Sequence, residues 1–150
     1  MTKHKLLKNR IKKNEGYKSF AYFGQLGLPT IGYGHLIKSN EKIFFKQKFS
    51  KKFLLNIFNL EFNETVMQYE KNYHKYNFSN NIRDVLIEMI FQLGINGQKK
   101  FLKMNEYIKK KQVFMASLEM INSLWYSQTP KRVDYLIKIL LKRHVEKKEK

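Results

Sequence analysis

Glu15 is the residue whose type and position most favour acid chemistry. It follows Lys5 to Asn14, a segment with the spacing of a short helix, and Gly16 directly after it is typical of a helix end. A negative charge at that end is mildly unfavourable with the helix dipole. A partly buried carboxyl there, with its pKa raised by burial, could act as a general acid. A solvated glutamate at a helix end is the alternative interpretation.

Groups that could assist such an acid are scarce nearby. From Gly16 to Asn40 the sequence has no Asp or Glu, and the only aspartates are Asp84 and Asp134. The hydroxyl of Thr30 can orient a water molecule, although it is not a base near neutral pH. Thr is also a common residue of β-strands, so Thr30 has a purely structural interpretation too.

Other kinds of chemistry are excluded by the residues that are present. There is no cysteine, hence no disulfide and no thiolate metal site. The four histidines, His4, His35, His74 and His144, do not form an HExxH pattern. Gly32-Tyr33-Gly34 lacks the third glycine of a dinucleotide-binding loop. We therefore expect neither a metal nor a cofactor.

The elements that must position Glu15 and Thr30 are a helix and a small β-hairpin. Leu6, Leu7 and Ile11 fall on one face of the first helix. Residues 17 to 35 are rich in Tyr, Phe and Gly, which predicts two strands joined by a turn. Pro29 within the second strand favours an edge strand.

The rest of the chain is predicted to be mostly helical. Ser50 is predicted to cap a long helix over 51–74, which a Tyr/Asn/Ser stretch ends. Residues 82 to 95 are apolar nearly all round and predict a buried helix that Gly94 and Gly97 end. Three more helices are expected, over 101–110, 112–126 and 130–144, the last with Thr129 as cap and Pro130 in its first turn. The charged tail, 145–150, is expected to fray.

Charge restricts the partners. The 150 residues carry a formal net charge of +18, which attracts polyanions such as nucleic acid, acidic membranes or an anionic cell wall. A Lys-rich composition inherited from an AT-rich genome is the alternative cause. EGYKSFAYF has the aromatic content of an RNA-recognition strand but fails that motif's pattern, so we expect no specific nucleic acid. No apolar run reaches the length of a membrane span. The basic N-terminal segment is not followed by an apolar h-region, so we expect no secretory signal.

Two segments resemble a known family. EGYKSFAYFGQLGLPTIGYGH, residues 15 to 35, resembles the E-G…Y…T-I-G-x-G-H signature of T-even-phage-type lysozymes and endolysins. LIEMIFQLGINGQKKF…SLWYSQTPKR, residues 86 to 132, is similar to that family's C-terminal lobe. The resemblance implies an α+β, mostly helical, lysozyme-like fold. We expect one domain, 1–150, with lobes at about 1–50 and 75–150 joined by the helix over 51–74.

The resemblance also implies roles at the N-terminal motif. Glu15 matches the family's general acid, and Thr30 matches a threonine that positions water. His35 matches a mainly structural histidine. The family's second carboxylate, an aspartate on the hairpin, corresponds to Gly24. Glycosidases usually need two carboxylates, so this departure affects the expected mechanism.

Substrate-binding residues follow from the same comparison. The positions that match family contacts to glycan or peptide are Leu36, Phe91, Gln92, Met104, Glu119 and Arg132. Met104 and Glu119 differ in type from the family residues. Phe91 can also belong to the core, and Trp125 and Tyr126 are expected to be core residues of the C-terminal lobe. Arg132 matches an arginine that pairs with the acid, which would lower the pKa of Glu15; Asn14 and Glu88 match its polar neighbours, changed in type.

Three functions remain open at the level of sequence. The first is a muramidase that cleaves between N-acetylmuramic acid and N-acetylglucosamine. The second is a single-glutamate enzyme resembling a lytic transglycosylase, and the third is an inactive, peptidoglycan-binding pseudo-lysozyme. In each the partners are bacterial peptidoglycan and anionic wall or outer-membrane polymers, and we expect a monomer. The endolysin resemblance implies accumulation in the host cytoplasm and release through a holin; a virion-borne or bacterial enzyme is the alternative.

Overall fold

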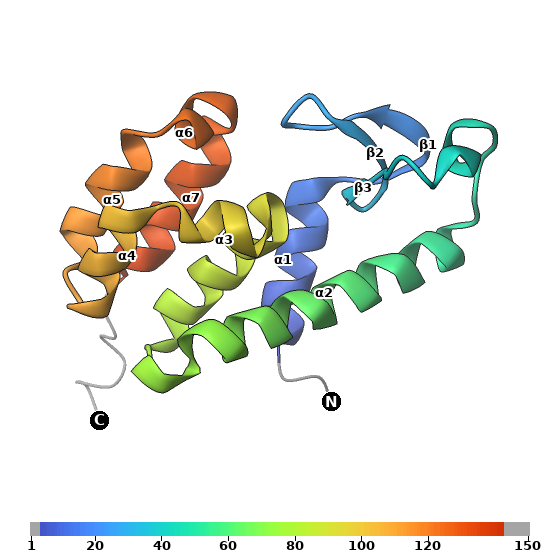
Figure 1. Ribbon diagram of the computed structural model, residues 1–150. Coiled ribbons are helices and arrows are strands. Elements are labelled where there is room, and N and C mark those ends of the chain that lie inside the picture. Colours follow the sequence, from blue (N-terminus) through green and yellow to red (C-terminus); the bar gives the residue numbers. More distant parts are fainter. Residues whose placement is uncertain (1–3, 143–150) are drawn as a thin grey trace. The chain divides into compact units, whose positions relative to one another are not determined.

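The computed structural model describes residues 4 to 142. The chain divides into two compact units, Met1–Gln68 and Tyr69–Lys150. The described part is mostly helical with one small three-stranded antiparallel sheet, which confirms the predicted fold class (Figure 1). The charged tail expected over 145–150 lies outside the described residues.

The first unit begins with helix α1, Lys5–Glu15. Leu7 and Ile11 are buried on one face of it, while Leu6 remains exposed. The helix ends after Glu15 because Gly16 adopts a φ of 77°, which side chains disfavour, while its N–H still donates to the Lys12 carbonyl at 3.0 Å. The predicted helix and its glycine stop are confirmed.

A sheet follows, made of β1 (Lys18–Phe23), β2 (Pro29–Gly32) and β3 (His35–Leu36) in the order β1-β2-β3. The hairpin is confirmed, but the prediction of an edge strand at Pro29 is wrong, because β2 lies between the other two strands. Pro29 is tolerated as the first residue of β2, and its carbonyl still accepts the Ile37 N–H at 3.0 Å.

The core beneath this sheet is aromatic and aliphatic. Ile31, Phe44 and Leu54 are buried together, with Phe49 packed against them. Phe44 belongs to the short 3₁₀ helix η1 (Lys42–Phe45), and Leu54 to the long helix α2 (Lys51–Tyr73). Ser50 caps α2 as predicted, since its hydroxyl accepts the Phe53 N–H at 3.1 Å.

The second unit is helical. After the 3₁₀ helix η2 (His74–Tyr76), the helices are α3 (Asn80–Lys99), α4 (Leu102–Lys109), α5 (Val113–Ile121), α6 (Leu124–Gln128) and α7 (Pro130–Leu141). Helix α3 is buried over most of its length, and α7 and α4 contribute Val133, Leu136, Met104 and Ile108 to the same core. The apolar pattern therefore predicted the central helix correctly.

Three local predictions in this unit are wrong. Gly94, with φ 79° and ψ 160°, interrupts α3, but a further helical turn runs through Gly97 to Lys99. The single helix expected over 112–126 is two helices, because the Ser123 hydroxyl caps a new start by accepting the Tyr126 N–H at 3.1 Å. Thr129 precedes α7, yet its side chain makes no cap and donates instead to the Trp125 carbonyl at 3.3 Å.

Helix α2 belongs to both units, since the division falls between Gln68 and Tyr69. Its early turns bury Leu54 and Phe58, and its last turns bury Tyr69 and Tyr73. The Tyr73 hydroxyl donates to the Gln98 side chain, which in turn donates to Asn105 at 2.8 Å within the second unit. The proposed single domain with lobes at 1–50 and 75–150 stays a prediction.

Over residues 4 to 142, none of the helices combines the length and the apolar character that crossing a bilayer requires. Within the same range, His, Asp and Glu side chains do not gather in threes suited to a metal ion.

Candidate active site

The carboxyl of Glu15 lies against the backbone of the turn between β2 and β3. A Cβ atom added to Gly34 would lie 2.5 Å from Glu15 Oε1, well inside contact distance. Gly34 also has a φ of 90°, which strains any residue with a side chain. A glycine at this position therefore lets the acid approach the sheet, and Glu15 is half-buried rather than free in solvent.

A hydrogen bond ties the end of α1 to the hairpin. The Gln25 amide donates to the Asn14 carbonyl at 2.6 Å, one residue before Glu15. Tyr22 lies close to the same carboxyl: burial, and then the negative charge of Glu15, raise the pKa of the Tyr22 phenol. A phenol carries its proton near neutral pH, so Tyr22 can act as a hydrogen-bond donor on this face of the hairpin.

Thr30 is buried in β2 directly opposite Tyr22 of β1 and Leu36 of β3. Its hydroxyl donates to the Leu28 carbonyl at 2.7 Å, so the oxygen retains lone pairs that can accept a hydrogen from water. Gly24 adjoins this hydroxyl, since a Cβ added there would lie 2.7 Å from Thr30 Oγ1. The hairpin position without a carboxylate is thus adjacent to the Thr30 hydroxyl.

The neighbours of Thr30 on β3 have separate roles. Leu36 is exposed at the sheet surface, as a ligand contact requires. His35 is buried and bonds Glu61 through Nδ1 at 2.7 Å and Glu41 through Nε2 at 2.9 Å. Burial alone would lower the pKa of His35, but the two carboxylates outweigh it and raise the pKa above its usual value. His35 holds β3, η1 and α2 together, as its structural interpretation predicted.

In the second unit, Gln92 is buried and held on both sides of its amide. Its oxygen accepts the Trp125 indole N–H at 2.9 Å, and its nitrogen donates to the Thr129 hydroxyl at 3.4 Å. Phe91, one residue earlier, is half-buried. Trp125 is core, as expected, whereas Tyr126 is only half-buried. These bonds fix the orientation of Gln92 in the helical core.

Arg132 of α7 is paired with Glu88 of α3. The guanidinium donates from Nε to Glu88 Oε2 at 3.0 Å, and both side chains are buried. A buried charge needs such a partner, because an uncompensated charge in the protein interior is costly. Glu88 therefore fixes the position of Arg132 within this unit.

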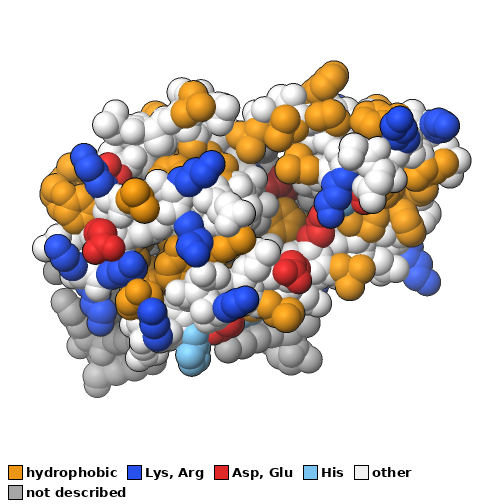
Figure 2. Space-filling view, viewed as in Figure 1, with side chains coloured by type: hydrophobic (Ala, Val, Ile, Leu, Met, Phe, Trp, Pro, Cys, Tyr) orange, Lys and Arg blue, Asp and Glu red, His pale blue; other side chains and the backbone are white. Residues whose placement is uncertain are grey.

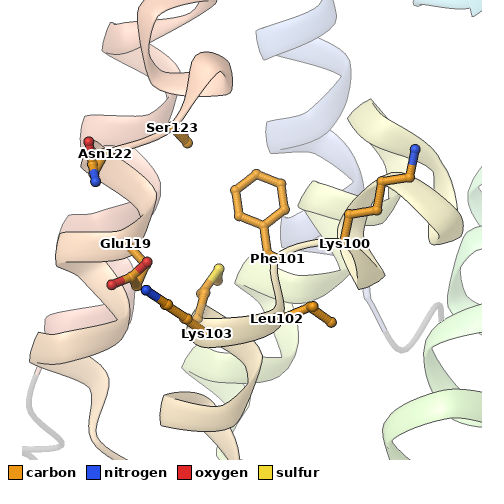
Figure 3. Close-up of a pocket in the computed structure, with 8 residues that line it drawn as sticks. Lys100, Phe101, Leu102, Lys103, Glu119, Asn122 and Ser123 are labelled. Carbon is orange, nitrogen blue, oxygen red and sulfur yellow. The ribbon is translucent and has the colours of Figure 1, made fainter.

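Met104 and Glu119, from α4 and α5, line one pocket of about 300 Å³ (Figure 3). Met104 forms a buried part of its wall, and Glu119 is half-buried. Figure 3 shows the Lys103 side chain extending toward the Glu119 carboxylate, with the Phe101 ring at the opposite wall. The pocket thus offers a negative group, a positive group and an apolar surface. Phe91, Gln92 and Arg132 do not line it.

Comparison with known proteins identifies the family. The model of the family described as phage lysozyme matches residues 12–145. The chain belongs to the phage lysozyme family. It is 30% identical over 159 residues to probable T4-type lysozyme 2 of Dictyostelium discoideum, a match that covers 89% of this chain and 92% of the relative. Probable T4-type lysozyme 1 of the same organism is 30% identical over 163 residues with equal coverage.

Membership makes the chain a lysozyme-type glycosidase, with peptidoglycan as the substrate of the family. Glu15 and Thr30, the two residues predicted to be catalytic, both lie within the matched residues. The first unit gathers Glu15, Thr30 and Leu36 on α1 and the sheet, and the second carries Phe91, Gln92, Met104, Glu119 and Arg132.

Sequence reasoning missed two residues of the first unit. The motif gives Tyr22 no role, yet the charge of Glu15 reaches its phenol. The glycine pattern gives Gly34 no role either, whereas its close approach to Glu15 is a specific one. A glycine directly before the histidine of the T-I-G-x-G-H block was the available signal.

Proposed function

We propose that the protein hydrolyses the β-1,4 bond between N-acetylmuramic acid and N-acetylglucosamine in bacterial peptidoglycan, with Glu15 as the acid. The observation that carries this proposal is the placement of the Glu15 carboxyl against Gly34 and near Tyr22. The close approach to Gly34 holds the carboxyl in a fixed position, as a general acid requires, and the Tyr22 phenol can donate a hydrogen bond to the carboxyl or to substrate.

In this mechanism Glu15 gives its proton to the glycosidic oxygen as the bond to the anomeric carbon breaks. A water that donates a hydrogen bond to the Thr30 hydroxyl then adds to the anomeric carbon and loses one proton to solvent, and the Glu15 carboxylate regains a proton from solvent. Thr30 orients the water and does not deprotonate it, because a hydroxyl is not a base near neutral pH; its own hydrogen is held by the Leu28 carbonyl. Without a carboxylate at Gly24, the reaction lacks a base or charge stabiliser that typically contributes about 10²–10⁴ in rate.

Gly24 favours a second candidate, in which the sugar's own hydroxyl attacks and an anhydro end forms. That reaction needs one acid/base, which Glu15 supplies, and no second carboxylate on the hairpin. Gly24 equally fits a third candidate, a peptidoglycan-binding pseudo-lysozyme, which would have no use for a placed acid beside Tyr22.

The three candidates give different products from purified peptidoglycan. We would digest it with the wild-type protein and with Glu15→Gln, and identify soluble products by mass spectrometry. Reducing ends from the wild type alone support hydrolysis, and anhydro ends, lighter by one water, support the transglycosylase reaction. Glycan that both proteins bind and neither cleaves would overturn the catalytic proposal.

For Met104 and Glu119 we propose contact with glycan or stem peptide. Their pocket combines a carboxylate, an ammonium group and an apolar wall, which suits a zwitterionic peptide chain. Glu119→Gln should raise KM for peptide-bearing peptidoglycan and leave KM for peptide-free glycan unchanged. An equal change on both substrates contradicts a peptide contact.

We also propose that the net charge of +18 draws the protein, as a monomer, to anionic wall polymers. The endolysin role follows from the motif resemblance: accumulation in the host cytoplasm, holin-mediated release and lysis. Expression in a bacterium with and without a co-expressed holin tests it. Lysis that needs both proteins and Glu15 supports the role, and lysis without the holin contradicts this route.

A further inference from the structure

Helix α5 exposes several large apolar side chains in addition to burying an apolar face. Ala116, Ser117 and Met120 face the core, whereas Phe114, Leu118 and Ile121 are 61%, 42% and 45% exposed. A surface helix normally shows the opposite arrangement, with polar residues outward. The packing of the second unit therefore does not account for Phe114, Leu118 and Ile121.

These three residues form one continuous strip, here called the α5 stripe. Their spacing of four and three residues puts them on one face of the helix, because a helix repeats about every 3.6 residues. Leu124, exposed in the first turn of α6, follows directly along the chain. In Figure 2 apolar side chains gather over α5 at the left edge of the view, with Lys and Arg side chains and a few acidic ones around them.

Positive charge adjoins the stripe. Lys110 and Lys111 are exposed between α4 and α5, where their charge is favourable at the C-terminus of α4 and unfavourable at the N-terminus of α5. The turn that carries them is ordered: the Lys111 N–H donates to the Ile108 carbonyl at 2.9 Å and the Gln112 N–H to the Tyr107 carbonyl at 2.8 Å. The one acidic residue of α5, Glu119, lines the pocket beside Lys103.

We propose that the α5 stripe, with Lys110 and Lys111, binds the surface of a bilayer that contains anionic phospholipid. Apolar side chains on one helix face, flanked by lysines, enter the boundary between headgroups and acyl chains while the ammonium groups contact lipid phosphates. A protein partner would need an apolar groove of matching shape with acidic groups around it. An anionic bilayer offers charged headgroups above apolar acyl chains everywhere on its surface. The binding is peripheral and separate from glycan cleavage.

Vesicle binding by the full chain tests this proposal. We would measure partition onto phosphatidylcholine vesicles containing about a quarter phosphatidylglycerol, at about 0.15 M salt. Phe114→Ser/Leu118→Ser should reduce partition about tenfold, because the lost side chains are those that leave water. The control is Leu60→Ser/Met67→Ser on α2, which removes residues that are 70% and 66% exposed. It should bind as wild type does.

A second readout locates the contact. The single native tryptophan, Trp125, is buried, so Phe114→Trp introduces an exposed reporter. Lipids brominated in the acyl chain should quench the tryptophan fluorescence of Phe114→Trp and should not quench the added tryptophan of Leu60→Trp. Equal losses for the two double variants, or no quenching at residue 114, would mean that net charge alone attracts the protein and would overturn the proposal. A dimer that Phe114→Ser dissociates would place a second copy of the chain on the stripe and overturn it as well.

Discussion

Gly24 and Thr30 lie so close that a β-carbon on the glycine would be 2.7 Å from the threonine hydroxyl oxygen. A side chain at residue 24 must therefore displace a hydroxyl that donates to the Leu28 carbonyl. Any change at residue 24 therefore also changes the environment of the Thr30 hydroxyl.

Restoring the carboxylate should help catalysis and harm stability. We expect Gly24→Asp to lower the free energy of unfolding by about 1–2 kcal/mol, because Thr30 must shift. It should raise hydrolysis of peptidoglycan by about tenfold or more, because a base or a stabilising charge is added. Gly24→Asn causes the same crowding without the charge, so it should lose stability and gain no rate. Equal rates for the two variants would show that the charge is not limiting.

Crowding at Gly34 should act on the acid itself. In Gly34→Ala the methyl group would lie 2.5 Å from Glu15 Oε1, and displacement of the carboxyl should cost about a hundredfold in kcat. Gly27→Ala is the matched control, because Gly27 has a similar φ of 74° and nothing within 4 Å of the added atom. Both variants should lose about 1–2 kcal/mol of stability from backbone strain. A comparable loss of kcat in Gly27→Ala would contradict a specific contact with Glu15.

The bonds of His35 to Glu61 and Glu41 should give stability a defined pH dependence. The pKa of His35 is raised above 6.5, so its contribution is complete below that pH and is lost as pH rises through the raised pKa. The pKa of Glu41 is lowered below 4.5, despite the opposing effect of burial, because the Lys38 N–H and His35 donate to it. Its contribution is therefore lost as pH falls through the lowered pKa.

His35→Gln should therefore lower the free energy of unfolding most between the pKa of Glu41 and the pKa of His35. We expect a loss of about 2 kcal/mol near pH 5.5 and a smaller loss near pH 8.5. Urea unfolding at both pH values measures the difference. His74→Gln is the control, because His74 meets Glu70 at 2.9 Å but is 81% exposed, and surface pairs contribute roughly 0–1 kcal/mol. A His35→Gln penalty that grows toward pH 8.5 would contradict the raised pKa.

The buried pair of Glu88 and Arg132 should be strongly coupled. Removing one partner in Glu88→Ala leaves a buried guanidinium without this carboxylate and should cost about 3–5 kcal/mol. The double variant Glu88→Ala/Arg132→Met should cost clearly less than the sum of the single changes. The more exposed pair of Arg83 and Asp84, 2.8 Å apart, should show a coupling of about 1 kcal/mol or less. If the double variant lost as much free energy of unfolding as the two single variants together, the expected coupling of Glu88 and Arg132 would be ruled out.

Sequence patterns predicted the elements that rest on local rules. The glycine after Glu15, the serine before α2 and the apolar run of α3 each specify a helix boundary or a buried face through chemistry confined to a few residues. The errors arose where a local signal had more than one structural outcome. Pro29 is compatible with an edge strand or with the start of a central one, and the second occurred.

The candidate site was only partly predictable for the same reason. The motif located Glu15, Thr30 and Leu36, but the closeness of Tyr22 to the acid depends on strand register. Met104 and Glu119 share a pocket because α4 packs on α5, which residue spacing alone does not determine. The boundary between α5 and α6 could not be predicted from residue spacing, because a serine is compatible with a helix interior as well as with the N-cap that Ser123 forms for α6.

The sharing of α2 between the two units has a consequence for recombination. Leu54 and Phe58 serve the first unit, whereas Tyr69 and Tyr73 serve the second, so the ends of this helix are not natural places to exchange modules. If two parent sequences were joined at Lys51, the first unit would lose its own Leu54 and Phe58. If they were joined at His74, the second unit would lose its own Tyr69 and Tyr73. Chimeras between relatives should therefore tolerate a junction near Gln68, inside a continuous helix, better than a junction in either adjoining loop.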